Sequence, residues 1–252
     1  MKIVSINNQK GGVGKTTLSF NLIKGLAAAG YRTLAVDNDP QGNLTSCFLE
    51  NELTLSANVM DIYSGQTVKP HFVSKGLDLI GADIHLAKVA EHDFEVIFKL
   101  KEGLAPFSED YDFVIIDCLP SFGYLSTAAL YASDLVLIPT KPTQFGLSGM
   151  SDLLDLIEKM RSRLNGNLTL LGIILNLVEN TVICKEFQSV LRKAYGEKVF
   201  ETEISKSVKI EESPTLNQSV VEYEPQSKSA MQCNAFTAEF INKIKVTDNG
   251  RK

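Results

Sequence analysis

Residues 3–18 read IVSINNQKGGVGKTTL, and this stretch decides the fold. A short apolar strand runs into a glycine-rich turn, and a helix follows, because Leu18, Leu22 and Leu26 recur at helical spacing. Gly30 then ends this helix before a second apolar strand at 33–36. The order of strand, loop, helix and strand is the setting that a phosphate-binding loop requires.

The residue types of this loop suit phosphate binding. Gly11, Gly12 and Gly14 let the backbone bend sharply, so that its N–H groups can approach phosphate oxygens beside the positive end of the helix. Lys15 is placed to reach the β- and γ-phosphates of ATP. The Thr16 hydroxyl can ligate Mg²⁺, and Thr17 can hydrogen-bond the α-phosphate.

The match to the P-loop pattern G-x-x-x-x-G-K-[ST] is imperfect, because Gln9 stands where the first glycine belongs. A glycine-rich turn with a chance Gly-Lys-Thr is the alternative interpretation. The strand before the loop and the helix after it favour the P-loop.

Two motifs carry a resemblance to a known family. The run from Lys10 to Thr17 resembles the deviant Walker A motif of the ParA/MinD family of P-loop ATPases, and residues 36–43, VDNDPQGN, resemble a second signature of that family. The similarity extends through Pro225 and is greatest to the short Soj-type partitioning ATPases. It implies that Lys10 reaches across a dimer interface to the partner's nucleotide. The ATP-binding residues expected in the loop are Lys10, Gly11, Gly12, Val13, Gly14, Lys15, Thr16 and Thr17.

Two strand ends supply the acidic residues expected at the site. Asp39 follows the second strand, where a carboxylate can orient the attacking water and assist the metal. Asp117 ends the apolar strand 111–117, in the Walker B arrangement that holds Mg²⁺ directly or through a water. A turn-capping role is the alternative for Asp117. Asp37, at the end of the second strand, is ambiguous, and a structural role there is at least as well supported as a role at the site. Thr16, Asp39 and Asp117 are the predicted metal residues, and Lys10, Lys15 and Asp39 the predicted catalytic ones.

The middle of the chain continues the resemblance with one departure. Residues 118–123 correspond to the family's switch segment, but Leu119-Pro120 stands where two prolines are usual. Residues 132–139 form a further buried strand, and residues 140–149 resemble the family's dimer-interface loop. The helix at about 150–163 has an apolar face, for which core packing is the simplest role.

The C-terminal third holds the predicted base contacts. Asn176 ends the strand 170–176, and the resemblance places a residue here beside adenine, which an Asn amide could pair with. A strand-end turn residue is the alternative. Pro214 resembles the segment that covers the base from the other side. Glu179-Asn180-Thr181 stands where the family often has an arginine, so that residue's role does not carry over.

The region from 185 to 209 is locally basic, with six cations against four carboxylates in a chain of net charge −5. This surface is the predicted contact with DNA, although a solvated helix face of mixed charge is an alternative. The predicted DNA residues are Lys185, Arg192, Lys193, Lys198, Lys206 and Lys209.

Length and composition indicate the number of domains, the absence of membrane spans and the state of the cysteines. A chain of 252 residues that is 44% hydrophobic can bury one core, so we expect a single P-loop domain over 1–252 with a doubly wound, mostly parallel α/β sheet flanked by helices. Residues 51–70 are expected to form a polar surface excursion. No apolar run is long enough to cross a membrane and no leader precedes the first strand, so we expect a cytoplasmic protein. The four cysteines make no CxxC pair, which favours reduced thiols, and the three histidines lack metal-ligand spacing.

The resemblance implies a function. ATP and Mg²⁺ would close a homodimer, which would bind nonspecific duplex DNA at the nucleoid until a ParB-like activator triggers hydrolysis, and so partition a plasmid or chromosome. We expect no DNA-binding extension, because the first strand begins at Lys2. A MinD-like ATPase at a membrane surface is the first alternative, but Phe236, Phe240 and Ile244 predict a last helix that packs on the core. ParA-like positioning of another cargo, such as chemoreceptors or a microcompartment, is the second alternative. An iron–sulfur ATPase needs paired cluster cysteines, which the chain lacks.

Overall fold

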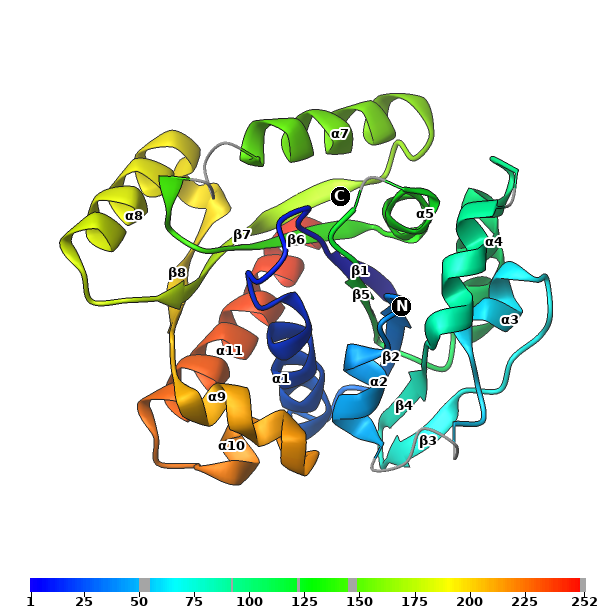
Figure 1. Ribbon diagram of the computed structural model, residues 1–252, viewed down its shortest axis with the longest axis horizontal. Coiled ribbons are helices and arrows are strands. Elements are labelled where there is room, and N and C mark those ends of the chain that lie inside the picture. The colour runs from blue at the N-terminus through cyan, green and yellow to red at the C-terminus, as the bar shows by residue number, and fades with distance from the viewer. Residues whose placement is uncertain (50–54, 92, 122, 145–148, 250–252) are drawn as a thin grey trace.

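One eight-stranded sheet organises the protein (Figure 1). The computed structural model describes residues 1–49, 55–91, 93–121, 123–144 and 149–249. The strand order is β3-β4-β2-β5-β1-β6-β7-β8, in which only the β3–β4 pair is antiparallel. The expectation of a doubly wound, mostly parallel sheet flanked by helices is confirmed.

The strands and helices follow each other in the alternating order of an α/β protein. The strands are β1 (Lys2–Ile6), β2 (Thr33–Asn38), β3 (His71–Ser74), β4 (Leu77–Ile80), β5 (Phe113–Cys118), β6 (Leu135–Thr140), β7 (Thr169–Val178) and β8 (Val199–Ser205). The α-helices are α1 (Lys15–Ala28), α2 (Asn43–Phe48), α3 (Val59–Tyr63), α4 (Val96–Leu104), α5 (Tyr124–Ala132), α7 (Met150–Arg163), α8 (Val182–Tyr195), α9 (Val208–Glu212), α10 (Val220–Tyr223) and α11 (Lys228–Asn249). The 3₁₀ helices are η2 (Ile84–Glu91), η3 (Ala105–Phe107), η4 (Gly196–Lys198) and η5 (Ser213–Leu216).

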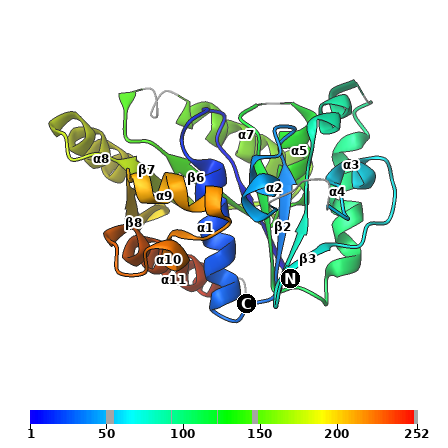
Figure 2. The ribbon, with the colours of Figure 1, turned by 60° about the horizontal axis from the view of Figure 1, so that its bottom comes forward.

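The central strands are apolar throughout because helices cover both faces of the sheet. β2, β5 and β6 are buried at every position, as expected for parallel strands between two helical layers. On one face the core joins α1, α2 and α11 to alternate strand residues, and on the other face two clusters join α3, α4, α5 and α7 to the remaining ones. Figure 2 shows α8 to α11 at one end of the molecule and α3 and α4 at the other.

Two predicted helices pack as their apolar faces indicate. Leu153, Ile157 and Met160 of α7 are buried in the core. Phe236 and Phe240 of α11 are also buried, with ring centroids 6.4 Å apart. These expectations are confirmed, and the last helix is a core element of the fold.

The expectation of a polar surface excursion at 51–70 is wrong in part. Residues 50–54 lie outside the described residues, but α3 buries Val59, Ile62 and Tyr63 against the sheet. The Asn58 side chain accepts a hydrogen bond from the Met60 N–H and so begins this short helix. A single helical turn is too short to give a clear apolar period in sequence.

Two further properties concern membranes and thiols. Within the described part of the chain, no helix has both the length and the apolar character of a membrane span. Cys47, Cys118, Cys184 and Cys233 are all free thiols.

The strand register brings the predicted site residues to one edge. Within the sheet, Asp117 of β5 pairs with Ile6 of β1 on one side and with Asp37 of β2 on the other. The glycine-rich loop follows β1 directly, and Asp39 follows β2. All of these residues therefore meet at the carboxyl ends of the parallel strands, where such sheets gather their ligands.

Candidate functional site

The glycine-rich loop between β1 and α1 is held in a shape that only glycine permits. Gly14 has a φ of +78°, and a Cβ atom there would lie 2.6 Å from the Asn176 Nδ2 atom. The Asn176 amide donates to the Val13 carbonyl at 2.8 Å, so the end of β7 braces the loop. This bracing contact needs the close approach that a glycine at position 14 allows.

Lys15 is the first residue of α1, and its side chain is only 7% exposed. Its ammonium group donates to the Lys10 carbonyl at 3.4 Å, which holds it against the loop. Burial lowers the pKa of Lys15, while the Asp117 carboxylate, followed by Cys118 and Asp39, acts in the opposite direction. The Lys15 ammonium group is placed to bind a polyphosphate, whose negative charge would favour the charged form of the buried lysine.

Asp117 is buried under the loop and is held by two hydroxyl groups of α1. Thr16 Oγ1 donates to Asp117 Oδ2 and Ser19 Oγ donates to Asp117 Oδ1, both at 2.7 Å. Burial raises the pKa of Asp117 to about 6, against the opposing effects of these two hydroxyls and of Lys15. Ser19 was missed in the sequence, although it lies one helical turn after Thr16 and so on the same face of the helix.

The two acidic residues after β2 have different surroundings. Asp37 is fully buried, and its carboxylate accepts hydrogen bonds from the Asp39 N–H and from both the N–H and the hydroxyl of Thr45. Burial, and then the nearby Asp117 carboxylate, raise the pKa of Asp37 to about 7. Asp37 thus joins β2 to α2, which is the structural role, whereas Asp39 faces the cavity and accepts from the Gln41 N–H at 2.9 Å.

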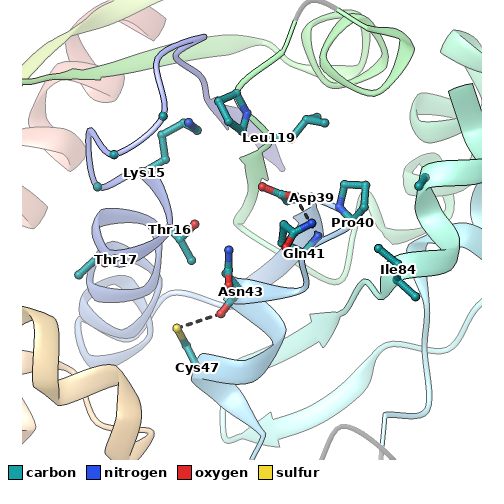
Figure 3. Close-up of a pocket in the computed structure, with 15 residues that line it drawn as sticks. Lys15, Thr16, Thr17, Asp39, Pro40, Gln41, Asn43, Cys47, Ile84 and Leu119 are labelled. Carbon is teal, nitrogen blue, oxygen red and sulfur yellow. Dashed lines mark hydrogen bonds between the residues drawn. The ribbon is translucent and has the colours of Figure 1, made fainter.

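These residues surround an open cavity of about 810 Å³ (Figure 3). The loop and the first turn of α1 form one wall, and Asp39, Pro40 and the start of α2 form the facing wall. A cavity of this size is large enough for a nucleotide. The described residues that line it are Gly11, Gly12, Gly14, Lys15, Thr16, Thr17, Asp39, Pro40, Gln41, Asn43, Cys47, Ile84, Ala87, Leu119 and Pro120.

The donor set fits a magnesium ion held jointly with phosphate. No group of three or more His, Cys, Asp or Glu side chains in the described residues could hold a metal alone. Mg²⁺ takes oxygen ligands and keeps several that are not from protein, so a hydroxyl and a carboxylate suffice. The Thr16 hydroxyl in contact with Asp117 is such a pair, and Asp39 is close enough to affect the pKa of Asp117.

The predicted base contacts are only partly brought together. Asn176 lines a small hollow beside Gly14 and Thr17, but its amide N–H group is already bonded to the loop. In this arrangement Asn176 braces the glycine-rich loop from the end of β7. Pro214 lies in η5, half-buried, and is absent from the described lining of both this hollow and the larger cavity.

Two more predicted features lie beside the cavity. The Lys10 N–H donates to Asn8 Oδ1 at 2.9 Å, and Lys10 is half-buried outside the described lining of the cavity. Leu119, which replaces a usual proline of the switch segment, lines the cavity together with Pro120. Phe122 of that segment and residues 145–148 of the predicted dimer-interface loop lie outside the described residues.

Comparisons with known proteins bear on this site. The model of the family described as "AAA domain" matches residues 1–170. The sporulation initiation inhibitor protein Soj of Bacillus subtilis is 36% identical over 241 residues, which span 91% of this chain and 94% of that protein. The chain belongs to the ParA/Soj family of P-loop ATPases.

Two further proteins show the same similarity. The chromosome partitioning protein ParA of Myxococcus xanthus is 32% identical over 249 residues, covering 94% of this chain and 86% of that protein. A crystal structure of cobyrinic acid a,c-diamide synthase from Mycobacterium smegmatis, with bound ATP analog and magnesium, superposes with a TM-score of 0.83. It is 27% identical and covers 97% of this chain and 96% of its own.

The basic region of this ParA-family chain does not form one patch. Lys185 lies in the first turn of α8, close to the carboxyl end of β7, and Lys206 and Lys209 follow the carboxyl end of β8. Lys193 lies near the other end of α8, about 12 Å away along a helix that rises 1.5 Å per residue, and Lys198 precedes β8. Only Lys185, Lys206 and Lys209 therefore share an edge of the sheet with the glycine-rich loop.

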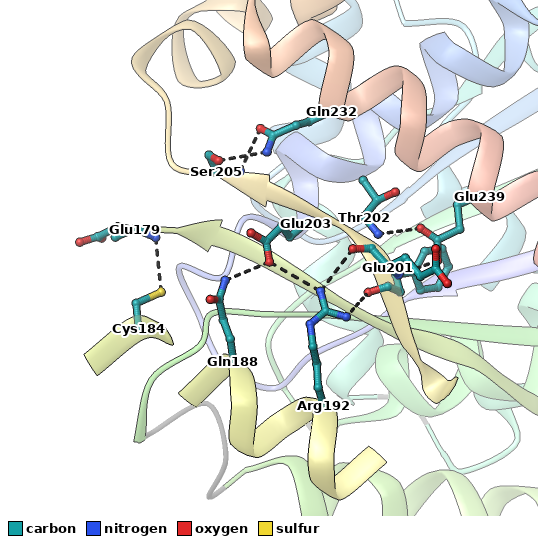
Figure 4. A network of polar contacts seen from close by, with 11 residues as sticks. Glu179, Cys184, Gln188, Arg192, Glu201, Thr202, Glu203, Ser205, Gln232 and Glu239 are labelled. Atoms are coloured by element: carbon teal, nitrogen blue, oxygen red, sulfur yellow. Dashed lines mark hydrogen bonds and ion pairs between the residues drawn. The ribbon is translucent and has the colours of Figure 1, made fainter. Parts of the chain in front are cut away.

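Arg192, one of the predicted DNA residues, makes structural contacts with β8 (Figure 4). Its guanidinium group donates to the carbonyls of Phe200 and Glu201 at 3.0 and 3.2 Å, and forms an ion pair with Glu203 at 3.6 Å. The N–H groups of Glu201 and Thr202, also on β8, donate to the Glu239 carboxylate of α11. These contacts satisfy an irregular part of the edge strand β8, so Arg192 stabilises the fold there, and its contact with DNA stays a prediction.

Proposed function

We propose that this ParA-family protein is a Mg²⁺-dependent ATPase, slow on its own, that closes into a homodimer on ATP and partitions a plasmid or chromosome. In the ATP-bound state the dimer binds duplex DNA without sequence preference, and a ParB-like activator protein stimulates hydrolysis and release. The whole chain acts as one P-loop domain, in the cytoplasm and on the nucleoid when it holds ATP.

The observation that carries this proposal is the meeting of Lys15, the Thr16–Asp117 pair and Asp39 around one cavity. Lys15 and the loop N–H groups would hold the phosphates, and Thr16 with Asp117 would hold the metal, which neutralises the phosphate charge when bound. Asp39 would orient the attacking water. The names of the Bacillus and Myxococcus relatives, and the ligands of the mycobacterial structure, support this assignment.

The test of the proposed function is nucleotide-dependent DNA binding. Fluorescence anisotropy of two unrelated labelled duplexes, titrated with protein in ATP and in ADP, should show binding of similar affinity to both duplexes in ATP alone. The logarithm of the affinity should fall linearly with the logarithm of the salt concentration, because phosphate contacts release counterions. Preference for one duplex, or equal binding in ADP, would contradict the proposal and favour a ParA-like ATPase that positions another cargo.

A prediction about the dimer follows from Lys10. The Lys10 backbone makes contacts within the loop, whereas its side chain lies outside the described lining of its own cavity. We expect Lys10→Ala to bind ATP with near-normal affinity but to stay monomeric in light scattering with ATP, because the partner's phosphates would lose a cation. Lys75→Ala removes an exposed lysine at the opposite edge of the sheet and should dimerise normally. A Lys10→Ala protein that dimerises like this control would refute the cross-interface role.

A further inference from the structure

Three neighbouring strands each end beside a charged residue on the edge that carries the glycine-rich loop. Lys141 follows β6, Glu179 follows β7 and Lys206 follows β8. The Oε1 atom of Glu179 lies 3.1 Å from the Lys141 ammonium and 3.7 Å from the Lys206 ammonium. One carboxylate oxygen thus serves two cations from the strands on either side, and we name these three residues the strand-end triad.

The triad is fixed in place by the backbone beneath it. The Lys206 N–H donates to the Val178 carbonyl at 2.9 Å, and the Glu179 N–H donates to Cys184 Sγ at 3.4 Å (Figure 4). Three residues before Glu179, the Asn176 amide is bonded to the glycine-rich loop. The triad therefore has a defined position relative to the nucleotide-binding loop.

Fold stability does not account for the triad. The side chains of Lys141, Glu179 and Lys206 are 33%, 39% and 55% exposed, and ion pairs at such exposure contribute little to stability. The charges have a larger effect on what the edge can bind. A carboxylate beside two lysines occupies the position in which a phosphate oxygen would accept from the same ammonium groups.

We propose that Glu179 is an internal competitor of phosphate, which holds Lys141 and Lys206 and thereby limits the affinity of this edge for duplex DNA. The inference rests on the proposed function and names a residue that sets the strength of its DNA contact. Lys185 and Lys209 lie on the same edge, and Lys209 is likewise paired, with Glu224 at 2.6 Å. A moderate affinity, easily lost with salt, suits a protein that must leave DNA after each hydrolysis.

The ionisation of the triad is consistent with this competition. The hydrogen bond and charge of Lys141, and then the charge of Lys206, hold the pKa of Glu179 below its ordinary value. Glu179 is therefore anionic at neutral pH. The two lysines become available only when a phosphate replaces the Glu179 carboxylate as their partner.

The experiment compares duplex binding by the wild type and Glu179→Gln in ATP over a series of salt concentrations. Glutamine keeps the shape of the side chain but removes the charge that holds the lysines. We expect about tenfold tighter binding at low salt, and a salt dependence steeper by about 1 to 2 in the logarithmic slope per protomer, as two further phosphates are neutralised.

Two control proteins separate the triad from a general effect of charge. Glu102→Gln changes the net charge equally and breaks an ion pair with Lys99 at 3.0 Å on α4, at the other end of the molecule (Figure 1). It should bind like the wild type. Adding Lys141→Gln and Lys206→Gln to Glu179→Gln should remove the gain, because the freed lysines carry it. A gain that is equal in Glu102→Gln, or that survives loss of both lysines, would overturn the proposal.

A second polyanion makes the result independent of the proposed function. On a heparin column, where binding needs no duplex, Glu179→Gln should elute at higher salt than the wild type and Glu102→Gln, with an unchanged melting temperature. Equal elution of all three proteins would overturn the inference even if the wild type binds DNA. If the wild type fails to bind duplex while the heparin shift is present, the proposed function is wrong and the masking of the lysines stands.

Discussion

Lys15→Ala is expected to abolish nucleotide binding or to lower ATP turnover by a factor of at least about 100. Among the described residues that line the cavity, Lys15 alone is a cation, while Asp39 contributes an anion and Asp117 lies just beneath. Removal of the ammonium group would leave the phosphates facing carboxylates with no positive side chain of the same protomer beside them. Isothermal titration with ATP and Mg²⁺ and a phosphate-release assay measure the two effects.

The interpretation of Lys15→Ala requires that the protein stays folded. Lys15 begins a helix, and among the described residues its side chain donates to the Lys10 carbonyl alone, so the circular dichroism spectrum and melting temperature should change little. Lys75→Ala supplies the matched control for the loss of one lysine at a distant exposed turn. A folded Lys15→Ala protein that hydrolyses ATP at the rate of this control would contradict the P-loop assignment.

The elements that sequence predicts best are those set by local pattern. The loop 10–17 carries its own glycines, and a buried parallel strand with an acid at its tip can place that acid at only one edge of the sheet. The positions of Lys15 and Asp39 on the walls of one cavity, with Asp117 beneath Thr16, could therefore be predicted from the sequence.

Side-chain partners distant in sequence could not be predicted in this way. Asn176 and Val13 are 163 residues apart, and their hydrogen bond depends on how β7 approaches the loop. The sequence alone left base contact and strand-end bracing open for Asn176, and only the packed sheet shows the bond to the loop. Ser19 shared a helix face with Thr16, but its bond to Asp117 depends on the distance between α1 and β5.

A charge count likewise does not show where the charged side chains lie in the fold. The segment 185–209 is basic as a sum, yet α8 and β8 distribute its cations over opposite edges of the sheet. A count over one segment also omits carboxylates from other parts of the chain. Glu179 forms an ion pair with Lys206, and Glu224 forms one with Lys209. Lys141 is 44 residues before the counted segment and joins the same edge only because β6 lies beside β7.

Asp39→Ala is expected to keep ATP binding while turnover falls by a factor of about 10² to 10⁴, the usual contribution of a positioned acid–base residue. Asp39 is 9% exposed at the wall of the cavity that faces the glycine-rich loop. Its Oδ1 atom accepts from the Gln41 N–H of its own turn, on the wall opposite the loop that would hold the phosphates. Phosphate binding should survive, and the ATP-bound dimer should accumulate because the step that opens it is blocked.

Asp39→Asn distinguishes the role of the Asp39 charge from the role of its hydrogen bond within the turn. Asparagine keeps an oxygen for the Gln41 N–H, so the turn should stay intact, but it cannot act as an anion toward water. Both variants should elute as dimers with ATP in size-exclusion chromatography and release phosphate slowly, whereas Asp110→Ala, at the opposite edge of the sheet, should behave as the wild type. Wild-type turnover in Asp39→Asn with slow turnover in Asp39→Ala would mean that Asp39 shapes the turn and that another group orients the water.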